Sequence, residues 1–185
     1  MKNNFLAKLF FLFILNFSLS FAFSQNASIP DGYKELKLGM SLEQVKNALE
    51  NNMIYGYSGE RDISLLPTEN RVLIETDASK YGSWSFISKC YFQFYEEKLY
   101  IITIELNTQN IDHYSVFSTL MKKYGKPSAL NPEKSTWQND KVIMSLERPL
   151  TLRYTDKIIF DKLQEEALVK KSFEEITRED FLEGL

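Results

Sequence analysis

The feature of this sequence that most constrains its fold is a pair of alternating apolar segments between residues 90 and 106. Apolar side chains recur at every second position in both segments, which is the period of a β-strand. Glu96 and Glu97 lie between the segments, where we expect the turn of an antiparallel hairpin. Tyr91 and Tyr95 would lie on the face that points away from the core. The core face would carry Cys90, Phe92, Phe94, Tyr100, Ile102, Ile104 and Leu106.

Two segments with helical periodicity each precede strands of this kind. Ser41 can cap the first helix, and Gln44 three positions later can complete a capping box, which predicts a helix over about residues 41–52. Asp112 can cap the second helix, and Gly125 lies where a C-cap is expected. Each helix would cover one face of an antiparallel sheet.

The order of elements along the chain predicts an internal duplication. We expect shorter strands at residues 53–57, 71–75, 136–138, 142–147 and 150–154. Helix, strands, helix, strands and a charged tail then follow one another. This order predicts an α+β fold with two degenerate helix-plus-antiparallel-meander units, over about residues 33–107 and 108–155. A charged C-terminal helical tail would occupy residues 156–185.

The first 24 residues have the pattern of a signal peptide. A basic start, an apolar run over residues 9–15 and small residues before Gln25 predict cleavage near Ser24/Gln25. The α+β domain would then be residues 25–155, in the periplasm or secreted. A retained anchor is the alternative, because residues 5–23 are nearly long enough to span a membrane. No cysteine lies near the cleavage point, so the sequence does not predict a lipoprotein.

Charge and cysteine content narrow the possible partners. The formal net charge is −3, which gives no electrostatic footprint for nucleic acid. No second apolar run approaches membrane-spanning length, so we expect no membrane span after signal cleavage. Cys90 is the single cysteine, and the fold must therefore rely on its apolar core and not on an internal disulfide. A disulfide-free exported chain favours a bacterial periplasm.

The stretch from Leu38 to Val45 resembles the opening of small envelope modules of the SmpA/OmlA outer-membrane assembly type. These modules share a fold with the β-lactamase-inhibitor protein. In that family a Gly-Met-Ser/Thr start leads a helix that ends in a Gly-x-Pro turn, followed by strands with a tryptophan. Gly125-Lys126-Pro127 and Trp137 look like the closing part, but they lie in the second half of this chain. The resemblance implies a non-enzymatic binding or assembly role without naming a partner. For an exported chain we expect the partner to be another envelope protein.

Side chains that could support catalysis are few and scattered. We expect His113, the single histidine, at the surface on the helix side opposite Phe117. One histidine and one cysteine cannot form a soft-ligand zinc site, and Cys90 among aromatic residues should be buried and inert. No Gly-rich phosphate loop and no Gly-x-Ser-x-Gly elbow occurs. We therefore expect no catalytic residue, cofactor or metal, and no enzyme.

Aromatic residues are the best candidates for contact with a partner. The loop over residues 55–62 combines two tyrosines, two glycines and an adjacent ion pair, which is typical of an adaptable contact surface. A simple turn, with its arginine held by a carboxylate, is the alternative. The strand tyrosines would extend the surface if their face is open, or form a second core if it is covered. The candidate partner-binding residues are Tyr55, Tyr57, Arg61, Trp84, Tyr91 and Tyr95.

These patterns leave three hypotheses for the function of the chain, of which an enzyme with an unrecognised carboxylate or tyrosine site ranks last. The first is an exported, periplasmic, non-enzymatic binding or envelope-assembly protein. The alternative is a carrier of a small apolar ligand, with a cavity between helix and sheet. A binding module should show an exposed aromatic patch, whereas a carrier should show an enclosed apolar cavity of a few hundred cubic ångströms, roughly the size of known ligand sites.

Overall fold

The computed structural model of the protein describes residues 28–66, 70–82 and 84–184. The expected signal peptide, residues 1–24, lies outside these described residues. The large sheet is antiparallel and has eight strands in the order β3-β4-β5-β6-β10-β9-β8-β7. Its first half is a meander of β3 (Ile63–Leu66), β4 (Arg71–Asp77), β5 (Ile87–Tyr95) and β6 (Lys98–Leu106). Its second half is a meander of β7 (Ala129–Leu130), β8 (Lys134–Gln138), β9 (Val142–Glu147) and β10 (Thr151–Asp156).

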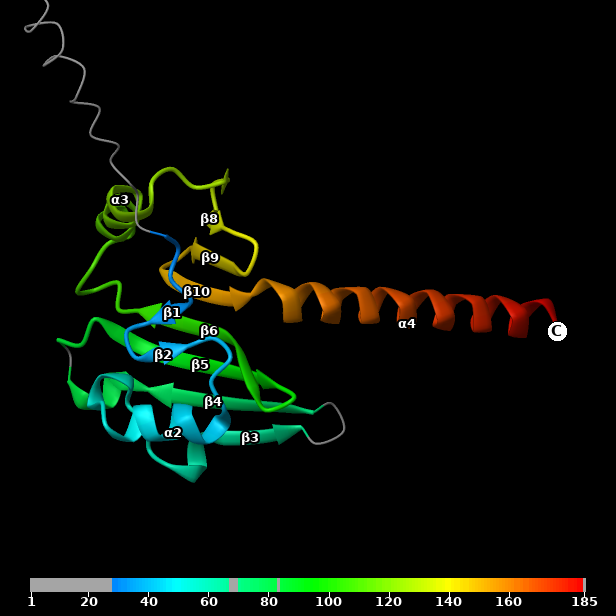
Figure 1. Ribbon diagram of the computed structural model, residues 1–185, viewed down its shortest axis with the longest axis horizontal. Coiled ribbons are helices and arrows are strands. Elements are labelled where there is room, and N and C mark those ends of the chain that lie inside the picture. The colour runs from blue at the N-terminus through cyan, green and yellow to red at the C-terminus, as the bar shows by residue number, and fades with distance from the viewer. Residues whose placement is uncertain (1–27, 67–69, 83, 185) are drawn as a thin grey trace, which may run out of the picture.

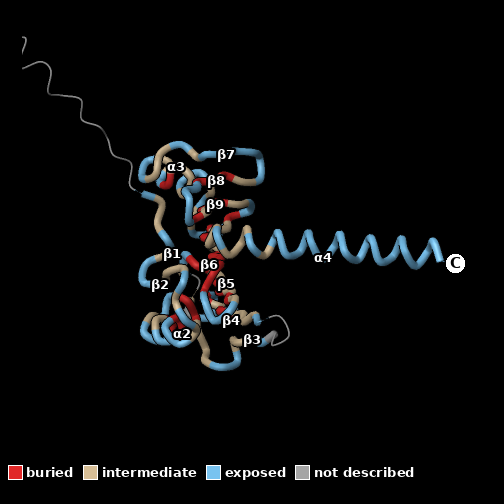
Figure 2. Tube along the Cα trace, turned by 45° about the vertical axis from the view of Figure 1, so that its right-hand side comes forward, coloured by how far each residue is buried: buried red, intermediate tan, exposed pale blue. Residues whose placement is uncertain are grey.

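The two halves of the sheet repeat one unit. A helix precedes each meander: α2 (Leu42–Glu50) before the first and α3 (His113–Tyr124) before the second. The last strands of the two meanders, β6 and β10, pair antiparallel at the centre of the sheet. Both helices and the small hairpin of β1 (Gly32–Tyr33) and β2 (Leu36–Lys37) lie on one side of the sheet (Figures 1 and 2). The predicted α+β fold with two helix-plus-meander units is confirmed.

Local signals in the sequence place the two helices as expected. The Ser41 hydroxyl accepts a hydrogen bond from the backbone N–H of Gln44, and the Gln44 side chain accepts one from the backbone N–H of Ser41. The Asp112 carboxylate accepts a hydrogen bond from the backbone N–H of Ser115 at 2.9 Å. These caps satisfy backbone donors that the first turn of a helix leaves free, and they fix where each helix begins.

The core lies between the sheet and the two helices. From the sheet it takes the alternate residues of one face, and from α2 and α3 it takes Val45, Leu49 and Leu120. The Trp137 indole N–H donates to the Gly125 carbonyl at 2.9 Å, so the second helix ends against the second meander. The sheet residues in the core include Ile74, Phe92, Phe94, Leu99, Ile102, Ile104, Met144 and Leu146.

The structure corrects the prediction for Tyr100. An irregularity in the register falls between Gln93 and Phe94, so that Phe94 pairs with Leu99 instead of Tyr100. An extra residue in one strand reverses the alternation beyond it. Leu99 therefore lies in the core, whereas Tyr100 lies on the other face, with its ring 6.4 Å from that of Tyr95.

The predicted strand over residues 53–57 is also wrong, because Met53–Tyr55 form a short 3₁₀ helix, η2. The Asn52 side chain accepts a hydrogen bond from the backbone N–H of Ile54 at 3.3 Å, and Gly56 ends the turn with a φ of 71°. An asparagine cap and a left-handed glycine favour a helical turn over a strand. The strands β1, β2 and β3 are findings that the sequence did not predict.

The C-terminal tail forms one helix, α4 (Lys157–Glu183), which continues from the end of β10 and projects away from the sheet (Figure 1). The Asp156 carboxylate caps it by accepting hydrogen bonds from the N–H groups of Ile158 and Ile159, both at 3.0 Å. Only its first turns lie near the body, where Lys162 is 3.5 Å from the Glu96 carboxylate. Within the described residues, no helix has both the length and the apolar character that crossing a membrane would require.

Candidate binding surfaces

The loop over residues 55–62, a candidate contact surface in the sequence, is folded into the body. Tyr55 is 0% exposed, and its ring makes edge contacts with the rings of Tyr33 and Phe92. Burial is the main cause that raises the pKa of Tyr55 above its usual value. The side chain of Tyr55 is therefore a core residue, and its prediction as a contact residue is wrong. Tyr57 is half-buried and packs against the same core, whereas Arg61 is exposed.

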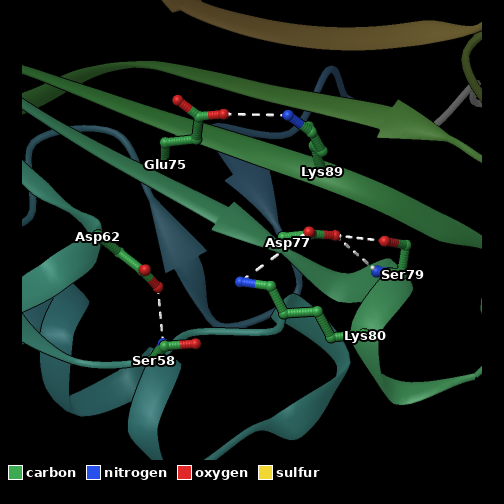
Figure 3. A network of polar contacts seen from close by, with 7 residues as sticks. All are labelled: Ser58, Asp62, Glu75, Asp77, Ser79, Lys80 and Lys89. Carbon is green, nitrogen blue, oxygen red and sulfur yellow. Dashed lines mark hydrogen bonds and ion pairs between the residues drawn. The ribbon is translucent and has the colours of Figure 1, made fainter.

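The polar residues of this loop are held by bonds to one another and to α2. The Asp62 carboxylate accepts a hydrogen bond from the backbone N–H of Ser58 at 2.6 Å (Figure 3). Glu60 forms an ion pair with Lys46. Among the described residues no carboxylate lies within ion-pair distance of Arg61, contrary to the ion pair suggested for it. The loop is thus a closed turn, with Arg61 at its outer edge.

Trp84 has a different environment, because it lines an open apolar pocket. The pocket has a volume of about 460 Å³ and lies at the end of the sheet, between η2, the β1–β2 turn and the segment before β5. Met53, Trp84 and Phe86 are 69%, 78% and 60% exposed, which is unusual for side chains of this size. The other described residues of the lining are Tyr33, Lys34, Ile54, Ala78, Ser85 and Ile87.

Backbone contacts fix the segment that carries the two aromatic walls of this pocket. The Ser85 hydroxyl donates to the Ile87 carbonyl at 2.8 Å, and the Asn110 side-chain amide donates to the Ser85 carbonyl at 2.9 Å. The backbone N–H of Asn107 donates to the Phe86 carbonyl at 3.0 Å. Trp84 and Phe86 therefore project from a segment that is anchored at Ser85 and at Phe86.

The opposite wall of the pocket is positioned by Gly56 and Asp77. A Cβ atom on Gly56 would lie 2.2 Å from the Asp77 carbonyl oxygen, so η2 and the next 3₁₀ helix, η5 (Ala78–Tyr81), approach each other closely there. The Asp77 carboxylate accepts hydrogen bonds from the hydroxyl and the backbone N–H of Ser79 (Figure 3). These hydrogen bonds lower the pKa of Asp77 and favour its charged, capping form.

The sheet face with Tyr91 and Tyr95 lies opposite α2 and α3 (Figure 2), and within the described residues only the first turns of α4 lie near it. We call it the open face. Tyr91 and Tyr95 are half-buried against neighbours, whereas Tyr100 on the same face is buried. The Lys162 ammonium lies 5.2 Å from the ring centre of Tyr95. Two lysines of the open face pair with glutamates: Lys89 with Glu75 at 3.1 Å, and Lys134 with Glu147 at 3.0 Å. At its edges the open face is a mixed polar and aromatic surface, whereas Tyr100 and Ile101 at its centre are buried without belonging to the main core.

His113 and Cys90 lie far from any reactive arrangement among the described residues. The His113 ring stacks on Phe117 with 6.4 Å between ring centres, so the two share a helix face and the prediction that they oppose each other is wrong. Burial, followed by the charge of Arg148, lowers the pKa of His113. No group of three or more histidine, cysteine and acidic residues is placed to hold a metal in the described part of the chain.

Cys90 is buried, as the sequence predicted, and burial raises its thiol pKa to about 12. The thiolate is the reactive form, so we expect the native thiol to resist alkylation. Iodoacetamide at pH 8 should leave the folded protein unmodified and should alkylate it fully in denaturant, as measured by intact mass. Rapid alkylation without denaturant would contradict the buried position.

Residues 31–166 match a known family, described as the TP0088 domain. This match covers well over half of the chain. The protein belongs to the TP0088 domain family. The TP0088 domain includes α2, α3, both meanders and the first turns of α4, whereas the rest of α4 lies beyond the matched residues. The chain matches no curated protein and no solved structure.

Of the six predicted contact residues, the TP0088 domain places Tyr91 and Tyr95 on the open face, four residues apart along β5, and Trp84 at a separate pocket. The sequence did not point to Met53, Phe86 or Lys34. Phe86 lies two positions after Trp84 in a glycine-containing loop. Two large apolar residues in one loop are a signal from which Phe86 could have been predicted as a contact residue. Met53 and Lys34 reach the pocket only through the folding of η2 and the β1–β2 turn.

Proposed function

We propose that this TP0088 domain protein is an exported, non-enzymatic binding or assembly protein of the cell envelope, and that α4 holds its protein partner. The single observation that carries the proposal is the exposure of α4. Seven large apolar side chains of this helix are more than half exposed, and none of its residues is buried. They are Ile158, Leu168, Val169, Phe173, Ile176, Phe181 and Leu182. Contiguous exposed apolar surface on a soluble protein is a mark of an interaction site.

The middle of α4 presents these side chains as a seam. Val169, Phe173 and Ile176 are spaced by four and three residues, which places them on one side of a helix. Val169 and Phe173 also border an open depression of about 620 Å³ along the same helix. A helix or strand of a partner that covers this seam would remove all three side chains from water. This geometry resembles the recognition of an apolar helix face in a groove.

Ion pairs in the outer part of α4 join residues of the same helix. Lys170 lies 4.0 Å from Glu174, and Lys171 lies 3.9 Å from Glu175, both at the i,i+4 spacing. Such exposed pairs each contribute only about 0.2–0.5 kcal/mol. Most helical stability in proteins comes from packing of an apolar face, which the outer part of α4 lacks in the described structure. A partner would supply that packing.

The predicted signal peptide and the resemblance to SmpA/OmlA-type modules support the envelope location and the assembly role. The non-enzymatic assignment rests on the nature of the pocket and the open face. Among the described residues, the pocket lining is apolar apart from Tyr33, Lys34 and Ser85, and the open face carries two lysine–glutamate ion pairs. Within the part of the chain that the structure describes, neither surface brings together acids, bases and a nucleophile, as a catalytic site requires.

Crosslinking in intact cells tests the partner. The photoreactive residue p-benzoylphenylalanine, placed at Phe173 of the full chain, should capture one envelope protein on irradiation. The same residue at Lys171, which is equally exposed but lies on the other side of the helix, is the matched control and should capture much less. A product of twice the chain mass would identify a second copy of this protein as the partner. Recovery of monomer alone would refute the proposal.

The pocket favours a second function, a carrier of a small apolar ligand. Its volume falls in the range of roughly 300–1,000 Å³ that is usual for ligand sites. Its position differs from the expected cavity between helix and sheet, because it opens at the end of the sheet. The two functions use separate surfaces, so each can be tested without the other.

A further inference from the structure

The pocket at Trp84 has one charged side chain among its described lining residues, that of Lys34. Lys34 lies in the β1–β2 turn with a φ of 53°, and its ammonium group is 5.8 Å from the ring centre of Tyr33. Among the described residues, no carboxylate lies within ion-pair distance of this ammonium. A positive charge at the edge of an apolar pocket suits a ligand that has an apolar body and an anionic end.

The acidic residues nearest to Lys34 in the sequence, and Asp77 next to the lining residue Ala78, interact with other side chains. Asp31 forms an ion pair with Lys37 at 2.8 Å. Glu35 accepts a hydrogen bond from the Asn52 side-chain amide at 2.7 Å. The Asp77 carboxylate, at the end of β4, is bound by Ser79 and lies 3.9 Å from Lys80. The charge of Lys34 is therefore not neutralised by its neighbours.

We propose that this pocket binds an amphipathic anion, with an unbranched acyl chain against Met53, Trp84 and Phe86 and the anionic group at the Lys34 ammonium. The inference rests on the carrier function and names the ligand class of that site. It is independent of the partner proposed for α4. A free fatty acid and a lipid with one acyl chain and an anionic headgroup share this chemistry.

Each part of the ligand would contribute in a different way. The acyl chain of the ligand covers the three exposed side chains of the pocket wall and removes them from water. Each added methylene strengthens binding about fourfold where it is fully buried. The Lys34 ammonium is exposed, so water and salt screen its attraction for an anion. We expect the charge to add about two- to fivefold in affinity, as for other exposed ion pairs. The acyl chain of the ligand thus provides affinity, and Lys34 provides selectivity for an anionic end.

Trp84 provides the signal for a binding experiment. The chain has two tryptophans, and Trp137 is buried in the core, so a ligand in the pocket should change mainly the emission of Trp84. Laurate, titrated below its aggregation concentration, should shift the emission to the blue and saturate. Decanoate, which has two methylenes fewer, should bind about sixteenfold more weakly at most. Trp84→Ala, at an exposed position, should keep the circular dichroism spectrum and abolish laurate binding by calorimetry.

Two comparisons separate the anion from the apolar chain. Lys34→Gln should weaken laurate binding by about two- to fivefold and leave dodecanol binding unchanged. Lys141→Gln, at an exposed lysine in the β8–β9 turn, is the matched control and should change neither. If laurate and dodecanol bind alike and Lys34→Gln has no effect, the anionic end is refuted and the carrier function stands. If neither ligand binds, both are refuted.

A third comparison identifies the source of the ligand. Laurate and lauroyl lysophosphatidylglycerol present the same chain with a carboxylate and a phosphate, respectively. Tighter binding of laurate supports a free fatty acid, and tighter binding of the lysolipid supports a lipid headgroup. Either result supports the anionic amphiphile. An apolar peptide that binds at Trp84 while both amphiphiles fail would overturn the proposal in favour of a protein ligand.

Discussion

Replacing Phe92 with alanine is expected to lower the free energy of unfolding by about 3–5 kcal/mol, which is a large part of the ~5–15 kcal/mol that stabilises a typical domain. Phe92 is 0% exposed and lies in the middle of β5. Its strand partners are Ile74 on β4 and Ile102 on β6, and the Tyr55 ring packs edge-on at 6.2 Å. The rigid sheet on both sides cannot close the cavity that the missing ring would leave.

Urea unfolding followed by circular dichroism would measure this effect. Gln93→Ala is the matched control, because Gln93 is the next residue on the same strand but lies half-buried on the open face. Its side-chain oxygen accepts a 3.4 Å hydrogen bond from the Tyr100 hydroxyl, and its loss should cost about 1 kcal/mol or less. A Phe92→Ala loss no larger than that of Gln93→Ala would mean that the core is not centred on this residue.

The residues that define the repeated unit could be predicted because their signals are local. The Ser41–Gln44 capping box, the Asp112 cap and the alternation in β5 each depend on side chains within a few positions. The turn between β8 and β9 also depends on a local side chain, because the Asn139 side chain accepts hydrogen bonds from the N–H groups of Lys141 and Val142. Short-range rules of capping and period are sufficient for such elements.

What the sequence did not predict depends on contacts between distant segments. Tyr100 changed faces because of a bulge against β5, which only the pairing of two strands can reveal. Tyr55 is buried because η2 packs on β5, and not because of any pattern around residue 55 itself. The candidate pocket has the same origin, since the β1–β2 turn, η2 and the segment before β5 are far apart in the sequence.

The two candidate surfaces belong to different parts of the chain. The pocket is lined by residues of the part of the chain that matches the TP0088 domain, residues 31–166. The seam of α4 at Val169, Phe173 and Ile176 lies beyond the matched residues. A variant in one surface therefore leaves the residues of the other unchanged, so the two proposals can be tested separately.

Gly56→Ala is expected to have a large effect on both stability and the pocket. The φ of 71° at Gly56 costs a residue with a side chain about 1–2 kcal/mol. The new methyl group would in addition lie 2.2 Å from the Asp77 carbonyl oxygen, and forcing backbone apart in a packed region costs about 1–3 kcal/mol more. We expect a total loss of about 2–5 kcal/mol in the free energy of unfolding, measured in urea.

Gly39→Ala separates the two causes, because Gly39 has a φ of 85° but no atom within 4 Å of an added Cβ. It should cost only the conformational part, about 1–2 kcal/mol. The close approach at Gly56 holds η2 against η5, and these two elements carry Met53, Ile54 and Ala78 of the pocket lining. Gly56→Ala should therefore also weaken laurate binding at Trp84, whereas Gly39→Ala should not. Equal losses of stability from the two variants would show that η2 and η5 are not held together at Gly56. The pocket would then lack the fixed wall that ligand binding requires.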